Sequence, residues 1–156
     1  MAAGTWQFYD QSPRTLAGGD VDSAVIKFAL VGAGYTPNQD TNATWADVSA
    51  NEITGGGTTG YTAGGQALSS IVFTEITKGY KFSSATVEWT AGADTLPTFK
   101  YVVAYIVAAA GAWNGQTNPL LGFFEGEAGG TVPLTTATNK VTINCPAGGW
   151  FDTTRP

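Results

Sequence analysis

The chain has 156 residues, a length that suits one domain, and 43% of them are hydrophobic, which is enough for a core. Only 12% of the residues are charged, and 7 basic against 12 acidic residues give a formal net charge of −5. The basic residues are scattered along the chain. The composition therefore argues against free nucleic acid and anionic membranes as partners, because both attract clustered Lys and Arg.

The N-terminal region and the apolar runs predict neither secretion nor membrane insertion. The N-terminus has no basic region followed by an apolar stretch, as a signal peptide would have. The longest apolar run, at 101–113, is too short to span a bilayer. We expect a protein that is made in the cytoplasm and stays there or is released without a secretion signal.

Two short helical segments are expected in the N-terminal half, on either side of a strand. The first lies between Trp6 and Leu16 and is limited by Pro13. Val25–Val31 (VIKFALV) then alternates with the period of a β-strand. The second helical segment is TWADVSANE, in which Thr44 can act as the N-cap with Asp47 three residues further on.

Strands dominate the rest of the chain. Ser83–Thr90 (SSATVEWT) and Lys140–Cys145 (KVTINC) alternate apolar and polar residues. Phe99–Val107 is apolar on both faces, which predicts a central strand that is covered on both sides. The other expected strands are Ser70–Thr77, Tyr80–Phe82, Leu120–Glu125 and Thr131–Leu134.

The spacing of these strands predicts the fold class. Glycine, proline and asparagine separate them at intervals of about ten residues, which is typical of sandwiches and barrels. We therefore predict an all-β domain over 1–156, an antiparallel β-sandwich or jelly roll with one or two short helices. Residues 1–24 are expected to form an N-terminal segment and 146–156 a C-terminal arm, which either folds back on its own sandwich or lies on a neighbouring subunit.

A glycine-rich stretch, GGGTTGYTAGG (Gly55–Gly65), contains the G-x-G-x-x-G spacing of a dinucleotide-binding turn. Such a turn needs a buried strand before it and a long helix after it, whereas here a short polar helix precedes the glycines and a strand-like run follows. Read as a P-loop, the stretch has Tyr61 where lysine should contact phosphate. We predict that it binds no nucleotide and that its glycines serve positive φ angles or close backbone approach.

Two groups of Asn and Asp are weak candidates for a bound cation. Asn38, Asp40 and Asn42 alternate like the first ligands of a calcium loop, and Asp20 and Asp22 form a second group. The glycine and the final glutamate of such a loop are missing. Side chains that cap turns explain the asparagines and aspartates more simply, and we expect no cofactor.

The side chains for catalysis are few. The chain has no histidine, which removes the usual general base and the common triads. Cys145, the only cysteine, is interpreted as a buried apolar thiol, and Glu125 and Glu127 as solvent-facing positions of a strand. We predict that the protein is not an enzyme and has no catalytic residue.

Aromatic residues outside the expected strands exceed what a core needs, and such residues often anchor interfaces. In the C-terminal arm, Arg155 is expected to meet an acidic partner. The aromatic interface candidates from this argument are Trp6, Tyr9, Trp113, Trp150 and Phe151.

Several phrases resemble, in order and spacing, a family of small virion proteins of tailed bacteriophages. They are GYTPNQDT (Gly34–Thr41), WADVSANEI (Trp45–Ile53), GYTAGGQAL (Gly60–Leu68) and, further on, ATVEW, YVVAY and NPLLGFF (Asn118–Phe124). The segment before Val25 departs from the family's leading helix. The resemblance implies a structural role without catalytic residues, and it makes the glycine stretch an assembly loop with Tyr61 as a further interface candidate.

Three functions follow from this resemblance and from the loop aromatics. The first is a capsid decoration (cement) protein in the virion, assembled in the host cytoplasm, that stabilises contacts between major capsid subunits. Decoration modules sit on local symmetry axes, so a homo-oligomer, most simply a trimer, is expected. The second is a tail, fibre or head–tail connector component. The third is a module that binds host-surface carbohydrate through loop tryptophans.

Overall fold

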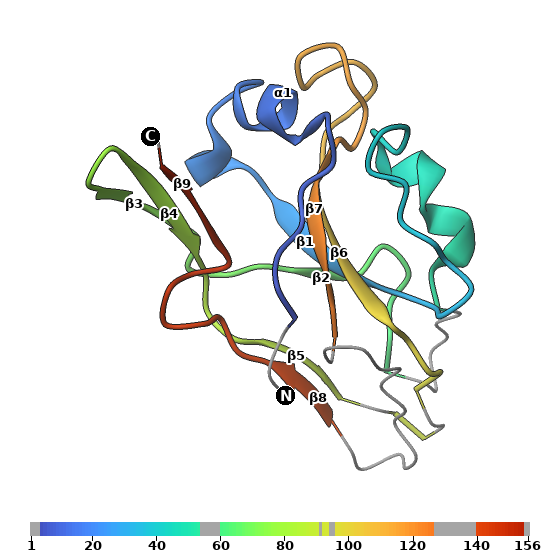
Figure 1. The fold of residues 1–156 in the computed structure, drawn as a ribbon. Helices are drawn as coiled ribbons and strands as arrows, with labels where there is room; N and C mark the ends of the chain where they lie inside the picture. Colours follow the sequence, from blue (N-terminus) through green and yellow to red (C-terminus); the bar gives the residue numbers. More distant parts are fainter. Residues whose placement is uncertain (1–3, 54–59, 91, 94–95, 127–139, 155–156) are drawn as a thin grey trace.

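The computed structural model describes residues 4–53, 60–90, 92–93, 96–126 and 140–154, and its strands are antiparallel (Figure 1). The predicted all-β class is confirmed. The expected strand Thr131–Leu134, the first glycines of the stretch Gly55–Gly65, Glu127 and Arg155 lie outside these residues. No helix in the described part of the chain is long and apolar enough to cross a membrane.

A four-stranded sheet forms the centre of the molecule, with the strand order β2-β1-β6-β7. Its strands are β1 (Ile26–Val31), β2 (Gln66–Ala67), β6 (Tyr101–Ile106) and β7 (Leu120–Glu125). As predicted from its two apolar faces, β6 lies between β1 and β7, and five of its six residues are buried. The N-terminal segment covers the outer edge of β7, where Gln7 N donates to Phe123 O at 2.7 Å.

A bulge in β7 changes which side chains face each side of the central sheet. Ala104 is paired with Gly122, whereas Tyr105 is paired with Leu120, so Leu121 is an extra residue. Because of this extra residue, Leu121 packs in the same core as Phe124, while Leu120 faces the opposite side.

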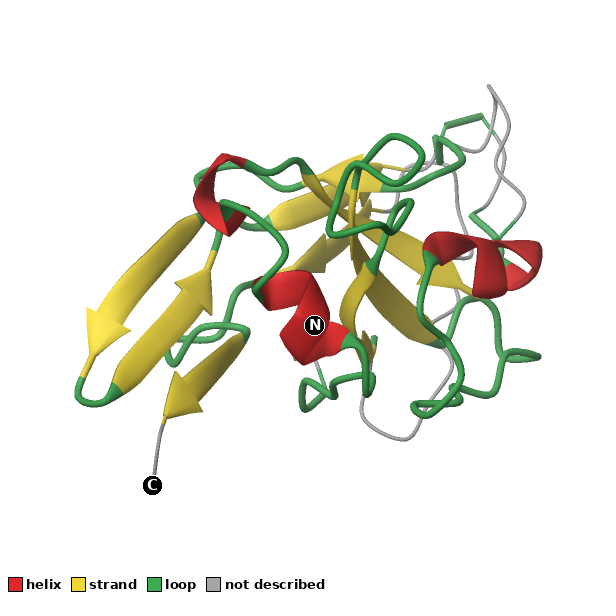
Figure 2. Ribbon diagram, turned by 90° about the horizontal axis from the view of Figure 1, so that it is seen from above, coloured by secondary structure: helices red, strands yellow, loops and turns green. Residues whose placement is uncertain are grey.

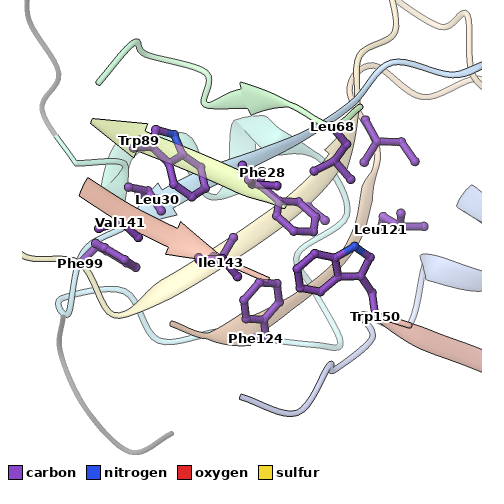
Figure 3. Packing of buried hydrophobic residues seen from close by; sticks show 14 of the residues in the cluster. Phe28, Leu30, Leu68, Trp89, Phe99, Leu121, Phe124, Val141, Ile143 and Trp150 are labelled. Carbon is purple, nitrogen blue, oxygen red and sulfur yellow. The ribbon is translucent and has the colours of Figure 1, made fainter. Parts of the chain in front are cut away.

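One face of the central sheet is covered by the two-stranded sheet of β5 (Val87–Thr90) and β8 (Lys140–Ile143). The alternation predicted for both strands is confirmed, because every second residue is buried, Val87 and Trp89 in β5 and Val141 and Ile143 in β8. Figure 3 shows Trp89, Val141 and Ile143 from this layer against Phe28 and Phe124 of the central sheet. Cys145, which follows β8, is half-buried rather than buried, because it lies beyond the last paired residue of the strand.

The opposite face of the central sheet is covered by the 3-10 turns η2 (Trp45–Asp47) and η3 (Ser49–Asn51) and by the loop before them (Figure 1). The predicted N-cap is present, because Asp47 Oδ2 accepts a hydrogen bond from Thr44 N at 2.8 Å. The ring of Trp45 stacks on Tyr105 at 4.8 Å between centroids. The buried residues of this second core are Tyr9, Ala29, Val31, Tyr35, Val48, Val103, Tyr105, Leu120 and Phe123.

The other helical segments are short. Helix α1 (Ser12–Leu16) begins with Pro13 in its first turn, as predicted, and Thr15 Oγ1 donates to Leu120 O at 2.9 Å. The 3-10 turn η1 (Val21–Ser23) follows it and leads into β1.

A third sheet consists of β3 (Val72–Ile76), β4 (Gly79–Ser83) and β9 (Phe151–Thr154), in the order β3-β4-β9. Figures 1 and 2 show that these strands extend away from the central sheet. Only the base of this sheet joins the main core, through Phe82, Phe151 and the preceding Trp150.

Candidate interaction surface

The structure places most of the predicted interface aromatics in the interior, which corrects the prediction. The exposed fractions are 1% for Tyr9, 2% for Tyr61, 5% for Trp150 and 8% for Phe151. Trp6 is half-buried and its ring lies 5.0 Å from that of Phe151. These segments lack regular alternation, but apolar surface from distant strands covers their rings, so they belong to the core of this chain.

Trp113 also makes its contacts within the chain. Its Nε1 donates to Thr15 O at 2.7 Å, and its ring lies so close to Gly18 and Gly19 that a Cβ at Gly19 would be 3.1 Å from it. Trp113 therefore supports the turn between α1 and η1.

The C-terminal arm docks on its own chain as far as the structure describes it. β9 pairs with β4 from Phe82↔Phe151 to Gly79↔Thr154. The indole of Trp150 lies against Phe28 and Phe124, with centroids 4.9 and 5.5 Å away. The alternative in which Trp150 anchors the arm on a neighbouring subunit is wrong for this structure, because the ring already fills a site in the main core (Figure 3).

The weak metal candidates act as turn-capping groups. Asn38 Oδ1 accepts hydrogen bonds from Asp40 N and Thr41 N, both at 3.2 Å, and Asp20 Oδ1 accepts one from Asp22 N at 3.2 Å. Within the described ranges, no three His, Cys, Asp or Glu side chains come together as a metal site would require. The structure brings the two candidate groups to different turns and does not combine them.

The described end of the glycine stretch has a structural role. Gly60, Gly64 and Gly65 have φ angles of 75°, 85° and 75°, and a Cβ at Gly65 would collide with the backbone of Phe28. Glu52 Oε1 accepts hydrogen bonds from Tyr61 Oη at 2.7 Å and from Gly64 N at 2.6 Å. The predicted positive φ angles are thus confirmed for these three glycines, and the predicted close backbone approach is confirmed for Gly65.

An open polar groove of about 650 Å³ runs between β2 and the β5–β8 sheet. It is lined by short polar side chains such as Gln66, Thr86 and Asn144, and no tryptophan lines it. The tryptophan platform that carbohydrate binding was expected to use is therefore not part of this groove.

The surface best placed for a partner is the three-stranded sheet β3–β4–β9. The outer edge of β3 is not paired with any described strand, and the register of β3 with β4 is continuous over the whole strand. Its edge contains no proline or bulge, which are two of the features by which edge strands avoid pairing. Val72 and Tyr80 are 49% and 53% exposed, although both are large apolar or aromatic side chains.

The two faces of this sheet differ in chemistry. Directly paired residues of antiparallel strands share a face, so Phe73, Phe82 and Phe151 form one aromatic row. The rings of Phe73 and Phe82 are stacked at 4.8 Å. The next row on the same face is Glu75, Tyr80 and Thr153. The other face mixes the aliphatic side chains Val72 and Ile76 with polar ones, and its middle row is Thr74, Lys81 and Asp152.

A cleft of about 360 Å³ separates the aromatic face from the turn between α1 and η1. The sheet contributes Phe73, Tyr80 and Phe151 to its lining. The opposite wall consists of Leu16 at the end of α1, Gly19 and Asp20 in the turn, and Val21 and Asp22 in η1. This cleft could not be predicted from the sequence, because the alternation that puts Tyr80 and Phe82 on one face of β4 does not show what lies opposite that face.

Comparison of the chain with protein-family models, curated proteins and solved structures finds no significant match.

Proposed function

We propose that the protein is a structural component of a bacteriophage particle, in which it acts as a capsid decoration protein that docks on major capsid subunits through the β3–β4–β9 sheet. The observation that carries the docking role is the projection of this sheet from the body, with an unpaired edge in the described residues and two exposed apolar side chains. The phage context comes from the resemblance of the three phrases between Gly34 and Leu68.

The three phrases between Gly34 and Leu68 contribute to both cores of the central sheet, Tyr35 to the core under η2 and η3 and Tyr61 to the main core. Tyr35 Oη, in the first phrase, donates a hydrogen bond to Oδ1 of Asn42, the residue directly after that phrase, at 2.9 Å. Glu52, in the second phrase, accepts a hydrogen bond from Tyr61 in the third. These hydrogen bonds give the three phrases a structural role, as a scaffold that members of such a family can share. The docking surface lies elsewhere, on β3 and β4, so it can vary while the scaffold is kept.

The first experiment is a quantified gel of intact, purified particles. A decoration protein is present in hundreds of copies, whereas a tail or connector ring has about six or twelve, as its cyclic symmetry requires. A low copy number would favour the second function, a tail or connector component. Absence of the protein from particles would overturn the proposal.

The second experiment tests the docking surface. Val72→Asp and Tyr80→Asp place a charge on the exposed parts of β3 and β4, and both should lower occupancy on particles without lowering the melting temperature. Val107→Asp is the matched control, because Val107 is also an exposed valine, at 44%, and lies outside this sheet. Equal occupancy of all variants would show that the sheet is not the docking surface.

The oligomer proposed with this role is a trimer on a local symmetry axis. Cyclic closure repeats one contact patch without open growth. Light scattering of the free protein should give three times the mass of the chain, and a stable dimer would contradict the trimer.

A further inference from the structure

We propose that the cleft between the β3–β4–β9 sheet and residues 16–22 binds the guanidinium group of an arginine side chain of the partner. This inference deepens the proposed docking role by naming the chemistry of the partner. It rests on the lining of the cleft, on the charges around it and on the way its walls are held.

The floor of the cleft suits a flat cation with an apolar stem. Phe73 is half-buried and Tyr80 is 53% exposed, so both rings present surface to a ligand. Leu16 and Val21 add an aliphatic wall. Arginine packs its methylene stem against such side chains and stacks its guanidinium on aromatic faces, which lysine does less well.

The charged groups that face the cleft are acidic. Asp20 and Asp22 line it, and Glu75 lies beside Tyr80 on the same face of the sheet. Lys81, the basic residue of β4, is paired with Thr74 and Asp152 on the opposite face, and Lys78 lies in the turn at the tip of the hairpin. A cation in the cleft therefore meets the carboxylates of Asp20 and Asp22 on one wall and aromatic rings on the other.

The arrangement favours an organic cation over a metal ion. The described acidic side chains do not form a group of three that could hold a metal, and much of the rest of the cleft lining is apolar or aromatic. A guanidinium group does not need three carboxylates around one point. Its flat face can stack on the aromatic rings while its N–H groups donate to separate carboxylates.

The acidic wall is held in place before any ligand arrives. Asp20 Oδ1 accepts from Asp22 N at 3.2 Å, Ser23 Oγ donates to Asp20 O at 3.1 Å, and the ring of Trp113 packs under Gly18 and Gly19. A wall that is already ordered loses little conformational freedom on binding, which favours affinity.

The test uses the free full-length protein and an acetylated, amidated Gly-Arg-Gly-Arg-Gly peptide, followed by NMR of the labelled protein at low salt. We expect saturable shifts at the residues that line the cleft. The same peptide with citrulline in place of arginine keeps the shape and removes the charge, and it should bind about tenfold more weakly.

Variants assign the binding to the cleft. The double variant Asp20→Asn and Asp22→Asn and the single variant Tyr80→Ala should each weaken the arginine peptide about fivefold to tenfold, as expected for losing exposed charges or a cation–π contact. Asp152→Asn, on the opposite face, is the matched control and should leave affinity unchanged. Equal binding of the citrulline peptide, no saturable shift, or an equal effect of Asp152→Asn would overturn the inference. None of these results depends on the particle, so they are distinguishable from failure of the proposed function.

Discussion

The phenol of Tyr61 donates a 2.7 Å hydrogen bond to Glu52 Oε1 and accepts one of 3.0 Å from Leu30 N. Tyr61 is 2% exposed, and its ring lies in the main core with Phe28 and Leu30. One side chain thus joins the glycine stretch to a central strand and to the end of the 45–53 segment.

Tyr61→Phe should lower the free energy of unfolding by about 1–3 kcal/mol, because the buried Leu30 N–H loses its hydrogen bond to the phenol and the Glu52 carboxylate loses one of its two donors. Denaturant unfolding measures the change. Tyr80→Phe removes a hydroxyl from an exposed tyrosine and should leave the midpoint unchanged. A shift of equal size in both variants would show that the buried hydrogen bonds contribute nothing specific.

Alkaline pH should destabilise the protein through its buried tyrosines. Burial, followed by the nearby charge of Glu52, raises the pKa of Tyr105 to about 12. The folded protein keeps this proton at a pH where the unfolded chain, whose tyrosines titrate near pH 10, has lost it. The free energy of unfolding should therefore stay level up to about pH 10 and fall as the pH rises toward about 12. Tyr105→Phe should reduce the slope over this interval, and an unchanged slope in that variant would contradict this origin of the pH dependence.

Val103→Asp should abolish soluble expression. Val103 is fully buried in β6, between Ala29 and Phe123 on the neighbouring strands. The free energy of unfolding of a domain is about 5–15 kcal/mol. An unpaired, buried carboxylate at this position would remove a large part of it. Val107→Asp, at an exposed position just after β6, should be tolerated, and normal melting of the Val103 variant would contradict the position of β6 in the fold.

Deletion of 148–156 should destabilise the isolated protein, because the arm supplies Trp150 and Phe151 to its own core. Loss of a buried tryptophan or phenylalanine typically costs about 3–5 kcal/mol, so the truncated chain should lose its cooperative thermal transition. Trp150→Ala should lower the melting temperature strongly, and Asp152→Ala, at an exposed position of the same strand, should not. A truncated chain that melts like the intact one would restore the interpretation of the arm as a contact to a neighbour.

The glycine stretch should bind no nucleotide. The described glycines face a strand, and Tyr61 is committed to Glu52 and Leu30 rather than free to contact phosphate. Calorimetry with ATP, GTP and NAD at millimolar concentration should show only heats of dilution. Saturable binding of any of the three would contradict this function for the glycines.

The strands and their buried faces could be predicted from local patterns in the chain. Alternation with period two is a local property of an extended chain, so Val87, Trp89, Val141 and Ile143 were assignable to the core without a structure. The two apolar faces of Phe99–Val107 likewise required cover on both sides. The cap at Thr44 and the short helix at Pro13 depend only on neighbours along the chain, and both were predicted.

Contacts between distant parts of the chain set which loop aromatics lie inside and where the surface for a partner is. Trp150 is buried because Phe28 and Phe124, far away in the sequence, meet it, and no local pattern encodes such a contact. The bulge at Leu121 and the hydrogen bond from Tyr61 to Glu52 likewise depend on contacts between separate segments of the chain. The cleft beneath Tyr80 exists because η1 and the β3–β4 hairpin are placed by separate parts of the core, so its acidic and aromatic walls come together only in the folded chain.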